Sequence, residues 1–123
     1  MAKQVLDVGN CGPDHATISQ LLEKQFAVKT HQADQASDAL SLLRREKIDL
    51  VLVNRKLDID YSDGIAVIEQ IKAEPEFAGV PVMLVTNHDQ YQQEAVAAGA
   101  EYGFGKLQLN DATTQERLAR FLA

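Results

Sequence analysis

The sequence lacks the features that would place it in several broad classes of protein. It has one cysteine, Cys11, so no intrachain disulfide can form and nothing favours an oxidising compartment. Its longest apolar runs, 50–53 and 80–85, are far shorter than a membrane span, and the first residues lack the apolar region of a signal peptide. We therefore expect a cytoplasmic protein that does not enter a membrane.

Positive charge is also scarce. The chain has 12 Lys and Arg against 18 Asp and Glu, which gives a formal net charge of −6. Binding to nucleic acid needs clustered cations, so direct contact with nucleic acid is not expected. The local basic cluster at 44–47 stands at the end of a predicted helix, where cations complement the helix dipole.

Apolar, β-branched stretches alternate with amphipathic stretches along all 123 residues. This pattern is typical of a parallel sheet covered by helices on both faces. The length fits one domain, 1–123, with an ordinary globular composition of 46% hydrophobic and 24% charged residues. We expect strands near 4–9, 27–31, 49–54, 80–86 and 101–105, and helices near 14–25, 35–46, 64–74, 89–98 and 111–122.

Polar residues follow several of these predicted strands. Gly9 and Asn10 end the first strand, Asn54 ends the third, Thr86 ends the fourth, and Lys106 lies just beyond the fifth. In open α/β sheets, ligands bind at the carboxyl ends of the strands. We therefore expect these five residues to converge on one rim of the sheet.

Together these features resemble the receiver domain of response regulators, and the resemblance covers essentially the whole chain. It depends on the five β/α units and on a set of residues in the family's order: Asp63-Gly64 opening the third helix, Thr86, Gly99-Ala100 and Lys106. The resemblance implies a flavodoxin-like (βα)5 fold, with a doubly wound, five-stranded parallel sheet in the order 2-1-3-4-5. It also implies a role in two-component signal transduction.

The phosphorylation pocket of that family is degenerate in this sequence. In the family, two adjacent acids after the first strand hold magnesium, and an aspartate ending the third strand accepts the phosphoryl group. The corresponding residues here are Gly9, Asn10 and Asn54. Phosphoryl acceptance needs a carboxylate nucleophile and a divalent ion, and magnesium prefers charged oxygen ligands. We expect a pseudo-receiver that binds no metal and no cofactor.

Other acids nearby do not replace the missing ones. Asp7 lies two residues before Gly9, which places it roughly 6–7 Å deeper in the strand, where a carboxylate must be paired or have a raised pKa. Asp58, Asp60 and Asp63 fall in the loop after the third strand. We interpret them as a solvated loop in which Asp63 also caps the third helix, with a weak loop-only cation site as the alternative.

Thr86 and Lys106 match residues that contact the phosphoryl group in the resembled family. A partly buried Lys106 ammonium without carboxylates needs a compensating partner, and the simplest is the side-chain carbonyl of Asn54 or a backbone oxygen. The alternative is that Asn54, Thr86 and Lys106 bind an anion, either phosphate or sulfate or an acidic side chain of a partner.

The position that carries the family's switch aromatic, three residues before Lys106, is Gly103 here. The usual coupling of threonine to that aromatic is therefore not expected. Three other aromatic residues, Tyr91, Tyr102 and Phe104, are candidates for an interface formed by the fourth helix, fifth strand and fifth helix. The resemblance implies that a protein partner or a second copy of the chain binds there.

The sequence offers little support for an enzyme. It has no glycine-rich dinucleotide loop, no Ser-His-Asp order and no paired carboxylates at the rim. The leading hypothesis is a signalling module that acts by protein–protein interaction without accepting phosphate. The alternative is a small-molecule or anion sensor that uses the rim around Asn54, Thr86 and Lys106.

Overall fold

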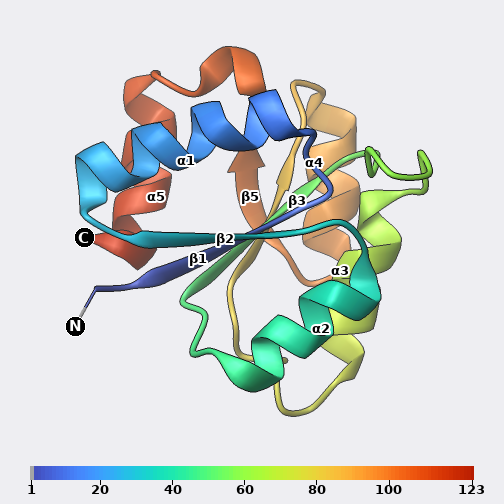
Figure 1. The fold of residues 1–123 in the computed structure, drawn as a ribbon. Helices are drawn as coiled ribbons and strands as arrows, with labels where there is room; N and C mark the ends of the chain where they lie inside the picture. The colour runs from blue at the N-terminus through green and yellow to red at the C-terminus, as the bar shows by residue number, and fades with distance from the viewer. Residues whose placement is uncertain (1) are drawn as a thin grey trace.

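The strands of the computed structural model, which describes residues 2–123, form one sheet of five parallel strands (Figure 1). Their order is β2-β1-β3-β4-β5, so the predicted fold class and strand order are confirmed. The strands are β1 (Gln4–Val8), β2 (Lys29–Ala33), β3 (Leu50–Asn54), β4 (Val82–Val85) and β5 (Glu101–Phe104). The helices are α1 (Gly12–Phe26), α2 (Ala36–Arg45), α3 (Gly64–Ala73), α4 (Asp89–Ala97), the short 3-10 helix η1 (Lys106–Gln108) and α5 (Ala112–Leu122).

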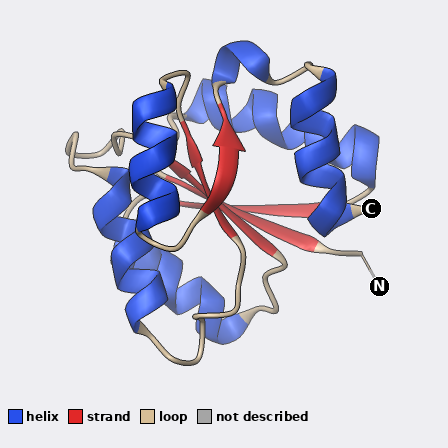
Figure 2. Ribbon diagram, turned by 180° about the vertical axis from the view of Figure 1, so that it is seen from behind, coloured by secondary structure: helices blue, strands red, loops and turns tan. Residues whose placement is uncertain are grey.

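Helices cover both faces of the sheet, because most residues of its central strands are apolar and need to be buried on both sides (Figure 2). On one face α1 and α5 pack against the sheet through Ile18, Leu22, Leu118 and Leu122. On the other face α2, α3 and α4 contribute a second cluster that includes Leu43, Ile68 and Ala95. Within residues 2–123, no helix has the length and apolar character needed to cross a membrane.

The predicted element boundaries agree with the structure to within two residues, and the largest shift is at β2. Ala27 adopts the left-handed conformation, with φ of 53°, and its N–H donates to the Glu23 carbonyl at 3.1 Å. This residue ends α1 and delays the second strand, which starts at Lys29 rather than 27. Helix η1 was not predicted.

The strand register brings the ends of three strands to one edge of the sheet. Val8 of β1 pairs with Val53 of β3, and Asn54 pairs with Val85 of β4. Strand β1 begins and α5 ends at the opposite edge of the sheet (Figure 1), where Lys3 Nζ donates to the Phe121 carbonyl at 2.9 Å.

Candidate functional site

The end of β1 is closed by the loop that follows β3. Gly9 has a φ of +83°, and its carbonyl accepts the N–H of Asp58 at 2.8 Å. A Cβ at Gly9 would lie 2.3 Å from Leu57 Cδ2 and 3.2 Å from Leu57 Cα. Leu57 is only 2% exposed and belongs to the core. The side chain of Leu57 therefore fills the space next to Gly9, which corresponds to the first of the two magnesium-binding acids in the resembled family.

Asn54 ends β3 with its side-chain amide directed to its own loop. Its Nδ2 donates to the Lys56 carbonyl at 2.7 Å. Beside it lies a hollow of about 320 Å³, which we call the rim hollow. Its lining residues are Cys11, Asp14, Asn54, Lys56, Asp58, Tyr61 and Lys106.

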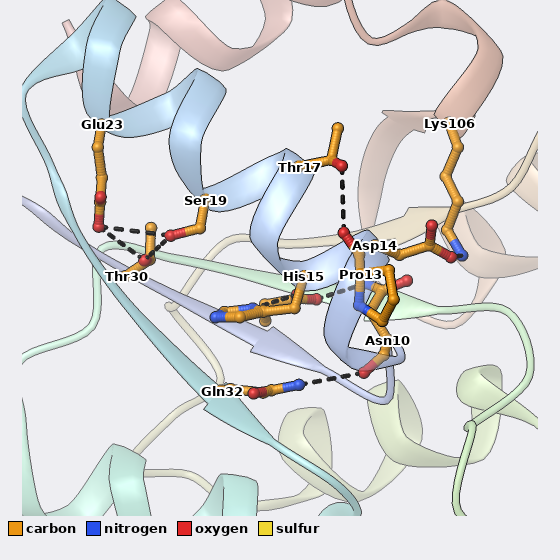
Figure 3. A network of polar contacts seen from close by, with 11 residues as sticks. Asn10, Pro13, Asp14, His15, Thr17, Ser19, Glu23, Thr30, Gln32 and Lys106 are labelled. Atoms are coloured by element: carbon orange, nitrogen blue, oxygen red, sulfur yellow. Dashed lines mark hydrogen bonds and ion pairs between the residues drawn. The ribbon is translucent and has the colours of Figure 1, made fainter.

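Lys106 pairs with Asp14 in the first turn of α1. Its Nζ lies 2.7 Å from Asp14 Oδ2, and both side chains are partly exposed (Figure 3). The hydrogen bond from Lys106 lowers the pKa of the Asp14 carboxyl. The prediction that Asn54 or a backbone oxygen holds Lys106 is wrong, because an ionised carboxylate binds an ammonium more strongly than a neutral carbonyl does.

Asp7 and Asn10 form a buried polar network beneath α1. Asn10 Nδ2 donates to Asp7 Oδ1 at 2.5 Å, and His15 Nδ1 lies 2.8 Å from Asp7 Oδ2. Burial raises the pKa of Asp7, and these two hydrogen bonds oppose the rise. The Asn10 carbonyl accepts from Gln32 Nε2 at 3.2 Å (Figure 3). Asn10 is thus 2% exposed and tied to structural partners.

Thr86 contributes to a different hollow. Its Oγ1 accepts the N–H of His88 at 3.2 Å, and it lines a cavity of about 210 Å³ together with Tyr102 and Arg117. Of the five residues predicted to converge, only Asn54 and Lys106 line the rim hollow. Across residues 2–123, no cluster of three or more His, Cys, Asp or Glu side chains is placed to hold a metal ion.

The three aromatic residues predicted at an interface have different environments. Tyr102 is 38% exposed, with the Arg117 guanidinium 4.5 Å from its ring centre and its hydroxyl bonded to Asp89. Tyr91 is half-buried beneath the Arg55 guanidinium, at 3.7 Å. Phe104 is fully buried between β5 and the α1/α5 layer, so the prediction that it contributes to an interface is wrong.

Sequence reasoning missed the roles of Asp14 and Leu57 in this region. It also grouped Gln92 with Tyr91 and Tyr102 as an exposed interface candidate, and that prediction is wrong because Gln92 is 2% exposed. Leu57 could have been found as the apolar residue inside an otherwise acidic loop. Gln92 lies three residues before Ala95, on the buried stripe of α4, where a polar residue needs hydrogen-bond partners. Asp63, by contrast, caps α3 as predicted, with Oδ1 accepting the N–H of Ile65 at 2.9 Å.

A parallel sheet of this order, covered by helices on both faces, defines the flavodoxin-like class of fold, and here a threonine follows β4 and a lysine follows β5. The sequence profile of the response regulator receiver domain matches residues 14–115, and the chain belongs to this family. Receiver domains are regulatory modules of two-component signalling, which is the role of this domain.

Several solved structures are similar to the chain. The signal receiver domain of a DNA binding response regulator protein (merR) from Colwellia psychrerythraea 34H is 27% identical, with a TM-score of 0.80 and 96% of both chains covered. A CheY-like receiver domain from Methylobacillus flagellatus is 18% identical, with a TM-score of 0.77 and full coverage of both chains. NtrX from Brucella abortus is 23% identical, with a TM-score of 0.81, and the chain covers 27% of its length. No curated protein matches the chain significantly.

Proposed function

We propose that this receiver domain does not accept a phosphoryl group and regulates its partners by protein–protein interaction alone. The observation that carries the proposal is the neutral amide of Asn54 at the end of β3. An amide has no ionised oxygen to attack phosphorus, and its nitrogen is already engaged by the Lys56 carbonyl.

The surroundings of Asn54 also argue against a magnesium site. Leu57 occupies the space beside Gly9, and Asn10 is held in the buried network with Asp7. Of the two carboxylates that line the rim hollow, Asp14 and Asp58, the first is bound by Lys106 at 2.7 Å. Magnesium would have to displace that ammonium and then find further charged oxygen ligands.

The surface formed by α4, β5 and α5, which we call the interaction face, is our candidate for the contact with a partner or a second copy. It presents two exposed apolar side chains, Val96 on α4 and Tyr102 on β5. An aromatic ring stacked under Arg117 suits an interface, because tyrosine and arginine are enriched at binding hot spots.

Anion sensing is the less favoured alternative. The rim hollow contains two carboxylates, Asp14 and Asp58, and the charge of Lys106 is balanced by the first of them. Thr86 lines the other hollow, so it does not add a donor to Asn54 and Lys106. An anion entering the rim hollow would meet as much negative as positive charge.

Incubation with acetyl phosphate and magnesium tests the proposal. We expect intact-mass spectra without a phosphoryl adduct for the wild type, and also for Asn54→Asp, because the magnesium acids would still be missing. A typical receiver domain treated in parallel provides the positive control. A hydroxylamine-labile phosphoryl group on the wild-type chain would refute the proposal.

Sedimentation and binding measurements test the interaction face separately. We expect Tyr102→Ala and Val96→Asp to weaken self-association or the binding of a purified partner. Gln20→Ala, on the distant surface of α1, provides the matched control. Equal binding by all three variants would place the contact elsewhere.

A further inference from the structure

Strand β5 contains one extra residue relative to β4. Met83 pairs with Glu101 and Val85 pairs with Phe104, so two steps along β4 match three steps along β5. Such a bulge leaves backbone groups without their ladder partners. The bulge falls at Gly103, the position where the family usually has its switch aromatic.

Two side chains from the flanking helices bind the backbone of Gly103. Its N–H donates to Gln92 Oε1 from α4 at 2.8 Å, and its carbonyl accepts Arg117 Nη1 from α5 at 3.0 Å. Gln92 also bonds β4, with Nε2 at 3.0 Å from the Leu84 carbonyl and at 3.3 Å from the Thr86 carbonyl. The amide of Gln92 thus bridges the two strands, and Gln92 is 2% exposed.

The close packing leaves no room for a side chain at this point. A Cβ on Gly103 would lie 2.3 Å from the Leu84 carbonyl oxygen and 3.3 Å from Gln92 Oε1. An aromatic residue at 103 would therefore require β4 and β5 to separate and Gln92 to leave. The buried amide and the family's switch aromatic are mutually exclusive in this arrangement.

Two further contacts hold helix α4. The Arg55 guanidinium, from the loop after β3, lies 3.7 Å from the ring centre of Tyr91. Asp89, at the start of α4, accepts the hydroxyl of Tyr102 from β5. These contacts join α4, β5 and the loop after β3 into one connected unit.

We propose that Gln92 and Arg117 clamp the bulge at Gly103, so that the interaction face keeps one binding conformation without any input signal. The inference deepens the proposed function and rests on it, because a domain that receives no phosphoryl group has to present its contact surface permanently. In the family, the threonine after β4 is coupled to a switch aromatic that moves. Here the hydrogen bonds of Gln92 and Arg117 hold the corresponding part of β5 in one position.

Amide exchange of the intact domain, followed by NMR, tests the clamp. Gln92→Met keeps the length and apolar stem of the side chain but removes all three hydrogen bonds. We expect exchange of the Gly103 amide to accelerate by about tenfold or more, since that amide loses its acceptor. The control, Glu94→Ala on the exposed side of α4, should change exchange of the same amide by less than about twofold.

Relaxation dispersion distinguishes a clamp from a merely stabilising contact. The wild type should show no exchange contribution for Val96, Tyr102 and Gly103, whereas Gln92→Met should show microsecond-to-millisecond exchange across all three. Arg117→Met gives an independent test of the other half of the clamp and should produce exchange at the same residues. Exchange already present in the wild type, or absent from both variants, would overturn the inference.

The same spectra separate this inference from the proposed function. Acetyl phosphate and magnesium are added to the wild type and to Gln92→Met. A phosphoryl adduct defeats the proposed function whatever the dispersion data show. If no adduct forms and the wild-type face is nevertheless in exchange, the clamp alone is refuted.

Discussion

The packing of Leu57 against Gly9 predicts how much stability the protein loses when residue 9 carries a side chain. Replacing Gly9 with alanine forces a side chain into the left-handed region, since φ there is +83°. That conformation costs about 1–2 kcal/mol in a non-glycine residue. The new Cβ also meets Leu57 Cδ2 at 2.3 Å, and overpacking of this kind costs about 1–3 kcal/mol. We expect Gly9→Ala to lower the free energy of unfolding by about 2–5 kcal/mol.

A double-mutant cycle separates the two contributions. Leu57→Ala should itself cost about 2–5 kcal/mol, because the residue is buried in the core. In the Leu57→Ala variant, the Gly9→Ala substitution should lose most of its overpacking penalty and keep its backbone penalty. The coupling energy is therefore about 1–3 kcal/mol and favours the double variant over the sum of the single ones.

Urea denaturation followed by circular dichroism measures all four proteins, with equal m-values required for the comparison. Gly79→Ala is the matched control, because a Cβ there would have no neighbour within 4 Å. It should change stability by less than about 0.5 kcal/mol. If Gly9→Ala costs no more than the control, or if its cost is the same with and without Leu57, the reasoning about this closed end of β1 is refuted.

Three further outcomes are expected. Burial raises the pKa of Asp7 above its unfolded value of 3.8, so the folded state binds the proton more tightly and its stability falls as the pH rises through the window above 3.8. Urea unfolding at several pH values should show that the stability of Asp7→Asn relative to the wild type rises with pH across this window, by at most about 1.4 kcal/mol per pH unit. A stability difference that does not change with pH would contradict the assignment. The pKa of Asp14 is lowered from 3.8 in the folded protein. The stability that its pair with Lys106 contributes is therefore fully present above pH 3.8 and is lost as the pH falls through the lower pKa of the folded state. Because both side chains are partly exposed, Lys106→Met should cost no more than about 1 kcal/mol in thermal unfolding at neutral pH, and a much larger loss would mean that Lys106 has a second, buried role. Titration with phosphate should leave the NMR shifts of Asn54 unchanged, and saturable shifts at millimolar anion would restore the sensor hypothesis.

The fold was accessible to sequence reasoning because its signals are periodic and local. The apolar runs at 50–53 and 80–85 have the length of covered strands, and the stripes of α2 and α5 have helical spacing. These local preferences agree with the global order of the sheet, so the element boundaries came out within two residues. The second strand was displaced because nothing in the sequence signals a left-handed alanine at Ala27.

The contacts of the candidate site were less accessible, because they depend on partners far apart in the chain. Asp14 and Lys106 are separated by 92 positions, and only the folded chain shows that they pair. Phe104 and Tyr102 both lie on the short strand β5, yet α5 covers the first and leaves the second at the surface. Strand alternation assigns a side chain to a face of the sheet but does not say how far the covering helix extends.

Because β1 begins and α5 ends at the same edge of the sheet, a tag or tether attached at either terminus emerges away from the rim hollow. Lys3 and Phe121 are bonded to one another there, at 2.9 Å. Immobilising the protein by either end on a sensor chip should leave the rim hollow accessible from solution. The same geometry makes the domain suited to circular permutation, since a short linker suffices to join the start of β1 to the end of α5.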